Sequence, residues 1–81
     1  GNVSANEFKA GNTSVNNNGI TIAHTDPNKV VSVTDSGISA GGNKVTNVAP
    51  GAISSTSTDA VNGSQLNATN NAFNSFLDDF I

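Results

Sequence analysis

The sequence predicts a mixed β plus α fold that is completed by the association of several chains. In residues 13 to 40, short runs of β-branched residues alternate with Gly-containing turns, which is typical of hairpins. Residues 67 to 81 contain neither Gly nor Pro and place apolar residues at helical spacing. Large apolar side chains are too few to build a core within one chain. Together these observations predict strands first, a helix last, and a core that is shared between chains.

The composition is the reason to expect a shared core. Asn, Ser, Thr and Gly fill 40 of the 81 positions, and nine of the 28 apolar residues are Ala. Burial of the nineteen larger apolar side chains falls short of the conformational entropy that an ordered chain of this length loses. Cys is absent, which excludes disulfides, and one His among scattered carboxylates does not suit a metal site. Self-association remains; the alternative is a disordered monomer, which the low charge and the clustered β-branched residues argue against.

The charge distribution excludes several classes of partner. The net charge is −3 and the only cations are Lys9, Lys29 and Lys44, so the chain has no basic patch for nucleic acid. No stretch approaches the ~20 apolar residues of a membrane-spanning helix, and we expect no membrane contact in this segment. No cofactor is expected. The chain does not start with a signal peptide, which suggests an excised segment or a complete small protein.

Two hairpins are predicted in the first half of the chain. Residues 1 to 12 are interpreted as the end of a strand or the tail of a preceding helix. A near-repeat follows, in which residues 14 to 22 match residues 32 to 40 at an offset of 18 positions. Each copy carries β-branched residues on both sides of a polar turn, and Asn18-Gly19 and Ser36-Gly37 supply a glycine that tolerates positive φ. Each copy is therefore expected to form a hairpin.

The predicted strands have one apolar face. They cover residues 13 to 16, 20 to 24, 29 to 34 and 37 to 40, with the turn between the hairpins at Asp26-Pro27-Asn28. Apolar residues alternate with polar ones, as in Ile20 with Ile22 and in Val31 with Val33. Two small hairpins have no second layer of their own. We expect the same strands of neighbouring chains to supply it.

A connection without regular structure is predicted next. Gly41-Gly42 ends the hairpin unit, and residues 45 to 48 form a short extended piece. Pro50 disfavours helical backbone at Ala49. Residues 51 to 57 are expected to form a loop of small side chains.

The helix is predicted to begin near residue 59. Thr58 suits the N-cap position because its hydroxyl can accept from the free amides of the first turn, and Ser57 is an equally suitable cap. Asp59 would place a negative charge at the positive end of the helix dipole. Gly63 costs about 1 kcal/mol relative to Ala inside a helix. We therefore expect Gly63 to permit a close backbone approach.

The helix carries the spacing of a coiled coil. Leu66, Phe73 and Phe80 are seven residues apart and form the predicted coiled-coil core. Large Phe side chains make a wide seam, which favours three strands over a tight dimer. Two registers remain open, completed by Thr69 with Phe76 or by Asn70 with Leu77.

Residues 59 to 66 read Asp-Ala-Val-Asn-Gly-Ser-Gln-Leu, and this stretch resembles the neck motif of trimeric autotransporter adhesins, the YadA-like family. Residues 41 to 51 resemble the segment that precedes such necks. Residues 1 to 40 resemble, more loosely, the small β connector modules of the same proteins. The resemblance implies structural roles for the neck residues Thr58, Asp59, Ala60, Val61, Asn62, Gly63, Gln65 and Leu66.

The resemblance implies a homotrimer in which three β-rich chains narrow into a parallel three-stranded coiled coil. It divides the chain into a β connector (residues 1 to 40), a lead-in and crossing loop (41 to 58) and a neck helix that starts the stalk (59 to 81). In such necks the loop crosses toward a neighbouring subunit. Polar layers in stalks of this family sometimes bind an anion or water on the three-fold axis; here this would require Thr69 or Asn70 to face inward.

The expected function is mechanical. Such a segment joins a β-rich head to a stalk and projects adhesive domains from the bacterial cell surface, as part of the extracellular passenger of an outer-membrane-anchored protein. Other domains would contact host cell-surface or matrix proteins. One alternative is a module that binds host matrix directly, although Phe8 is the only aromatic residue of the β region. A second alternative is a segment of a phage-type trimeric fibre.

An enzyme is not expected. His24 is the only imidazole, and Ser and Thr are too abundant for any one of them to stand out as its nucleophile. His24 is better interpreted as a solvent-facing residue beside a turn. Asp78 and Asp79 are adjacent, so on a helix they point ~100° apart and do not converge as an acid/base pair.

Overall fold

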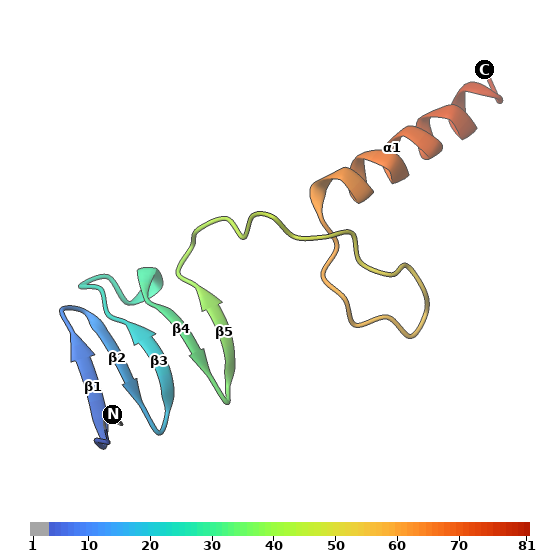
Figure 1. Cartoon of the computed structure of the whole chain (residues 1–81). Helices are drawn as coiled ribbons and strands as arrows, with labels where there is room; N and C mark the ends of the chain where they lie inside the picture. The colour runs from blue at the N-terminus through green and yellow to red at the C-terminus, as the bar shows by residue number, and fades with distance from the viewer. Residues whose placement is uncertain (1–3) are drawn as a thin grey trace. The chain divides into compact units, whose positions relative to one another are not determined.

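The computed structural model describes residues 4–81, which fall into two compact units with the boundary between Val45 and Thr46 (Figure 1). The boundary after Val45 lies five residues beyond the end predicted for the β connector. The first three residues of that predicted connector lie outside the described residues.

The first unit is a five-stranded antiparallel sheet whose strands follow one another in chain order (Figure 1). The strands are β1 (Glu7–Ala10), β2 (Thr13–Asn16), β3 (Gly19–Ile22), β4 (Val31–Thr34) and β5 (Gly37–Ala40). Each strand pairs only with its neighbours in sequence, so the sheet is a meander of short hairpins.

The turns follow from local chemistry. In the β2–β3 hairpin, Gly19 has φ +122°, and a Cβ there would collide with the carbonyl oxygen of Val33, so the position requires glycine. Between β3 and β4 a short 3₁₀ helix, η1 (Pro27–Lys29), replaces an open turn. Asp26 caps η1, because its Oδ1 accepts from the Asn28 amide at 2.9 Å.

The pairing register separates the sheet into an apolar and a polar face. Directly paired residues point to the same side of a sheet, so each row of partners belongs to one face. The apolar face carries one row of Phe8, Val15, Ile20, Val33 and Ile38 and a second row of Ala10, Thr13, Ile22, Val31 and Ala40. The polar face carries the row of Lys9, Ser14, Thr21, Ser32 and Ser39.

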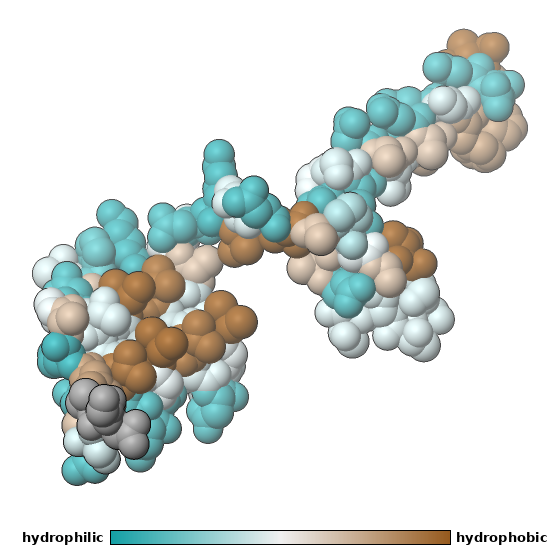
Figure 2. Space-filling view, in the orientation of Figure 1, coloured by the Kyte–Doolittle hydropathy of each residue, from teal (hydrophilic) through white to brown (hydrophobic). Residues whose placement is uncertain are grey.

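The apolar face is uncovered. Figure 2 shows a band of hydrophobic residues across one side of the sheet. Exposure along the first row ranges from 42% at Phe8 to 80% at Ile38. Among residues 4–81 no apolar side chain is buried, so this sheet has a face prepared for a second layer and no such layer within the chain.

Most of the predicted strands are confirmed. Strands at residues 13 to 16 and 37 to 40 are as expected, and so is the single apolar face. The strand expected at 20 to 24 is β3 (Gly19–Ile22), and the strand expected at 29 to 34 is shortened to β4 because η1 occupies its start. Of the two interpretations of residues 1 to 12, the strand is correct for the residues of β1.

The second unit consists of a loop and one helix, α1 (Gly63–Asp78). The helix starts four residues later than predicted, because Asn62 and not Thr58 is the N-cap. It ends at Asp78 with Asp79 as the C-cap, so the predicted core residue Phe80 lies beyond the helix. In the part of the chain that the structure describes, no helix has the length and apolar character needed to span a membrane.

Candidate functional site

The loop that precedes α1 is closed onto the first turn of the helix; we call residues 48 to 62 the clamped loop. The side-chain amide of Gln65 holds this loop closed through two hydrogen bonds with Gly51. Gln65 Oε1 accepts from the Gly51 amide at 2.9 Å, and Gln65 Nε2 donates to the Gly51 carbonyl at 2.7 Å. Both backbone groups of Gly51 are thereby satisfied, as they would be by a neighbouring strand.

Asn62 joins the start of the helix to the start of the loop. Its Oδ1 accepts from the Gln65 amide at 3.2 Å, and Gln65 Oε1 accepts from the Asn62 amide at 3.1 Å, which completes a capping box. The Asn62 Nδ2 group donates to the Val48 carbonyl at 2.8 Å. One side chain therefore caps α1 and holds a residue fourteen positions earlier in the chain.

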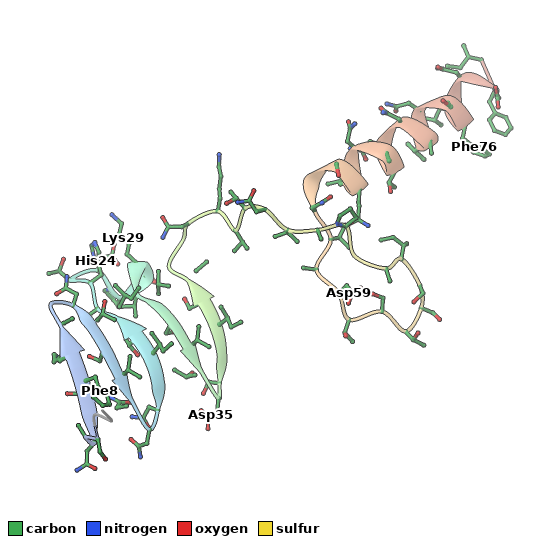
Figure 3. The ribbon with its side chains drawn as sticks, viewed as in Figure 1. Phe8, His24, Lys29, Asp35, Asp59 and Phe76 are labelled. Carbon is green, nitrogen blue, oxygen red and sulfur yellow. The ribbon has the colours of Figure 1, made fainter. Side chains whose placement is uncertain are left out.

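Asp59 closes the middle of the clamped loop. Its Oδ2 accepts from the Ala52 amide at 2.8 Å, and its own amide donates to Ser57 Oγ at 3.1 Å. The carboxylate thus stabilises loop backbone and does not act at the helix dipole, which corrects the role predicted for it. Figure 3 shows Asp59 in the loop, away from the helix.

Gly51 is a position of close backbone approach in the clamped loop. A Cβ built on Gly51 would lie 2.8 Å from the Asp59 Cβ and would collide with the Ala60 carbonyl oxygen. Real Cβ atoms do not come so close, so the loop closes only because Gly51 lacks a side chain. Gly51 was predicted only as part of a loop of small residues, because its close approach to Asp59 and Ala60 depends on how the loop folds back.

The close backbone approach predicted at Gly63 does not occur within one chain. Apart from its chain neighbours and the adjacent helix backbone, no atom of the described residues lies within 4 Å of a Cβ built at Gly63. Gly63 is the first residue of α1, where helix propensity has less weight than in the interior. A close approach at Gly63 stays a prediction for contacts between chains.

The apolar residues of the second unit are exposed. Val61 is 54% exposed, and Leu66 and Phe73 are each 59% exposed. Phe76 contacts Phe80 edge to face, with ring centroids 4.8 Å apart, and both rings stay largely open to solvent. The predicted core residues of the helix therefore present an uncovered apolar stripe, and both heptad registers remain open.

The described residues contain no group of three or more His, Cys, Asp or Glu side chains that could hold a metal ion. His24 is exposed, and its Nδ1 accepts from the Asp26 amide at 2.9 Å, which is a turn interaction (Figure 3). The site of interest is thus the clamped loop with its helix.

Comparison with known proteins assigns the family. The model of the coiled stalk of trimeric autotransporter adhesins matches residues 44–79, which include the clamped loop and α1. The chain is 53% identical over 57 residues to the autotransporter adhesin BtaE of Brucella suis biovar 1. This chain belongs to the trimeric autotransporter adhesins.

A solved structure supports the same assignment for the fold. The C-terminal stalk of AtaA from Acinetobacter sp. Tol 5, fused to GCN4 adaptors, matches with a TM-score of 0.55 and 34% sequence identity. The match covers 98% of this chain and 25% of that one. The BtaE match covers 70% of this chain and 7% of the adhesin, so the chain spans a small part of both relatives. The predicted family is confirmed.

Replacement of Gln65 tests the clamp. In Gln65→Ala the two backbone groups of Gly51 and the Asn62 amide lose their partner, and we expect a loss of about 1–3 kcal/mol in the free energy of unfolding. Gln65→Glu is the matched control, because it keeps an acceptor for both amides and replaces the donor to the Gly51 carbonyl by a carboxylate oxygen. Thermal denaturation followed by circular dichroism should rank Gln65→Glu between Gln65→Ala and the unchanged chain; equal stability of all three would contradict the clamp.

Proposed function

We propose that this segment is the connector and neck of a homotrimeric surface adhesin, in which it joins a β-rich module to a coiled-coil stalk. The observation that carries the proposal is the lack of any buried apolar side chain among residues 4–81. Both units nevertheless present ordered apolar surfaces, one on the sheet and one on the helix. Surfaces of this kind are typical of chains that complete their core with other copies.

The exposure of the apolar side chains supports association. On the sheet Ile20 is 44% exposed and Val33 is 47% exposed, and on the helix Leu66 and Phe73 are each 59% exposed. A trimer would cover these side chains by the same surfaces in all three copies.

In the proposed trimer the three sheets turn their apolar faces toward one another. The polar row that includes Ser14, Thr21 and Ser32 then faces the solvent. This arrangement supplies the missing second layer without any further element. The β connector would extend through residue 45 and the lead-in would begin there.

The neck would narrow the three chains into the stalk. Val61 and Leu66 would supply apolar contacts near the axis, and Phe73 would continue them along the coiled coil. The clamped loop fixes the direction in which each chain enters α1, because Gln65 and Asn62 hold it from within the same chain. We infer that the segment holds adhesive domains away from the bacterial surface, and that other parts of the protein contact the host.

Sedimentation equilibrium of the 81-residue chain tests this function. The expected mass is about 24 kDa, three times the 8.1 kDa of one chain, with both strand and helix signals in circular dichroism. A monomer with this circular dichroism would contradict the proposal. If the 81-residue chain is an unfolded monomer, the same chain should be fused after residue 81 to a trimeric coiled coil and measured again. Failure of that fusion protein to fold would also contradict the proposal.

A further inference from the structure

The sequence contains two Asn-Gly steps, Asn18-Gly19 and Asn62-Gly63. Such a step is chemically labile, because the backbone nitrogen that follows an asparagine attacks the side-chain Cγ, and glycine has no Cβ to obstruct the approach. The two steps lie in different settings. Asn18-Gly19 closes the β2–β3 hairpin, and Asn62-Gly63 starts α1.

The reaction at such a step needs only water. The glycine nitrogen gives up its proton to the solvent and forms a bond to the asparagine Cγ, while the bond from Cγ to Nδ2 breaks and Nδ2 takes up a proton and leaves as ammonia. Water then opens the resulting succinimide ring at one of its two carbonyl carbons, which produces aspartate or isoaspartate. A fold that holds the asparagine side chain away from the glycine nitrogen therefore slows the reaction, and a fold that leaves the side chain free permits it.

The Asn62 side chain is held by three hydrogen bonds. Its Oδ1 accepts from Ser64 Oγ at 2.8 Å and from the Gln65 amide at 3.2 Å. Its Nδ2, which would have to leave as ammonia, donates to the Val48 carbonyl at 2.8 Å. Closure of the succinimide ring would break these bonds and open the cap of α1, so the reaction at Asn62 requires local unfolding first.

Asn18 has no comparable restraint. It is exposed and lies in the short loop that joins Asn16 to Gly19, the last residue pair of the β2–β3 ladder. Its backbone amide donates to Asn16 Oδ1 at 2.8 Å, but within residues 4–81 the structure shows no hydrogen bond to its side-chain amide. The end of a hairpin also opens more readily than the middle of a sheet, which frees the Gly19 nitrogen for attack.

We propose that Asn18 is a site of spontaneous deamidation in this chain and that the cap of α1 protects Asn62 from the same reaction. The consequences at the two positions differ. Isoaspartate at position 18 would lengthen the backbone of the loop that sets the register of Asn16 with Gly19, and it would add a negative charge there. Aspartate at position 62 would keep an acceptor for the helix amides but lose the donor to the Val48 carbonyl. The fold thus leaves the labile step in the hairpin open and closes the one at the start of the helix.

Deamidation rates in the folded and unfolded chain test the proposal. The chain is incubated at mildly alkaline pH, with circular dichroism to confirm the fold, and in parallel in guanidinium chloride, and the conversion at each asparagine is followed by mass spectrometry of its peptides. If the chain alone is unfolded in buffer, its fusion to a trimeric coiled coil is used. Folding should slow deamidation of Asn62 at least about ten-fold and that of Asn18 less than about three-fold. Equal slowing at the two sites, or stronger slowing at Asn18, would overturn the proposal.

Two substitutions test whether the cap is the cause of the protection. Ser64→Ala removes one hydrogen bond to Asn62 Oδ1, and Gln65→Ala removes the other half of the capping box. Each rate is compared with that of the same variant in guanidinium chloride, and Asn18 serves as the internal control. We expect faster deamidation of Asn62 in the folded variants and no change at Asn18. If Gln65→Ala fails to fold, Ser64→Ala decides; undiminished protection of Asn62 in every variant that folds would overturn the role of the cap.

Discussion

Replacement of Ile20 by Asp is expected to abolish self-association and to unfold the sheet. Ile20 lies on the central strand β3, where Val15 and Val33 are its direct partners on the apolar face. In the proposed trimer this face is buried, so three carboxylates would be brought together without counter-charges. The effective desolvation penalty is several kcal/mol for each buried carboxylate. Three such penalties exceed the total free energy of unfolding expected for so small a protein. Sedimentation should show monomers, and circular dichroism should show loss of the strand signal.

Thr21→Asp is the matched control for this substitution. Thr21 follows Ile20 directly, but its side chain belongs to the polar face, where it pairs with Ser14 and Ser32. The same charge at this position stays in water, and we expect a change in stability within ±0.5 kcal/mol. If Ile20→Asp and Thr21→Asp both leave the trimer intact, the apolar face is not the interface between the chains.

The sheet was largely predictable because its signals are local. Strict alternation of apolar and polar residues predicts one apolar face, and the glycines after Asn18 and Ser36 predict the tight turns. β1 was less clear, since Phe8 is its only large apolar residue and four residues give little periodicity. β1 is defined by its pairing with β2, a contact that no pattern within residues 7 to 10 contains.

The start of the helix shows where local reasoning is insufficient. Thr58 and Asn62 are both good N-caps, and their intrinsic capping free energies are similar. Asn62 is the cap because Gln65 stands at the third helical position and completes a capping box. In addition, the side-chain Nδ2 group of Asn62 donates to the Val48 carbonyl, which holds Asn62 in place. The spacing Asn-x-x-Gln in residues 62 to 65 is a signal in the sequence for the capping box. The bond to Val48 depends on how the loop folds back and has no signature in the sequence.

Replacement of Gly51 by Ala is expected to open the clamped loop. The new Cβ would collide with the Ala60 carbonyl oxygen and crowd the Asp59 Cβ, both of which belong to the segment that leads into α1. Relief of the collision would separate Gly51 from Gln65 and break both of their hydrogen bonds. Overpacking of this kind costs about 1–3 kcal/mol, and in a trimer it is repeated in each chain. Thermal denaturation should therefore show a clearly lower midpoint, and an unchanged midpoint would contradict the close approach at Gly51.

Gly63→Ala is the informative comparison for Gly51→Ala, because it adds the same methyl group at a glycine that no described atom of the chain crowds. Ala also has the higher helix propensity, so within one chain the change should be neutral or slightly stabilising. A trimer that is weakened by Gly63→Ala would place the close approach predicted for this residue between chains, at the point where the three helices converge. A trimer that tolerates it would leave Gly51 as the glycine on which the geometry of the loop depends. The two substitutions thus distinguish a constraint within each chain from a constraint between chains.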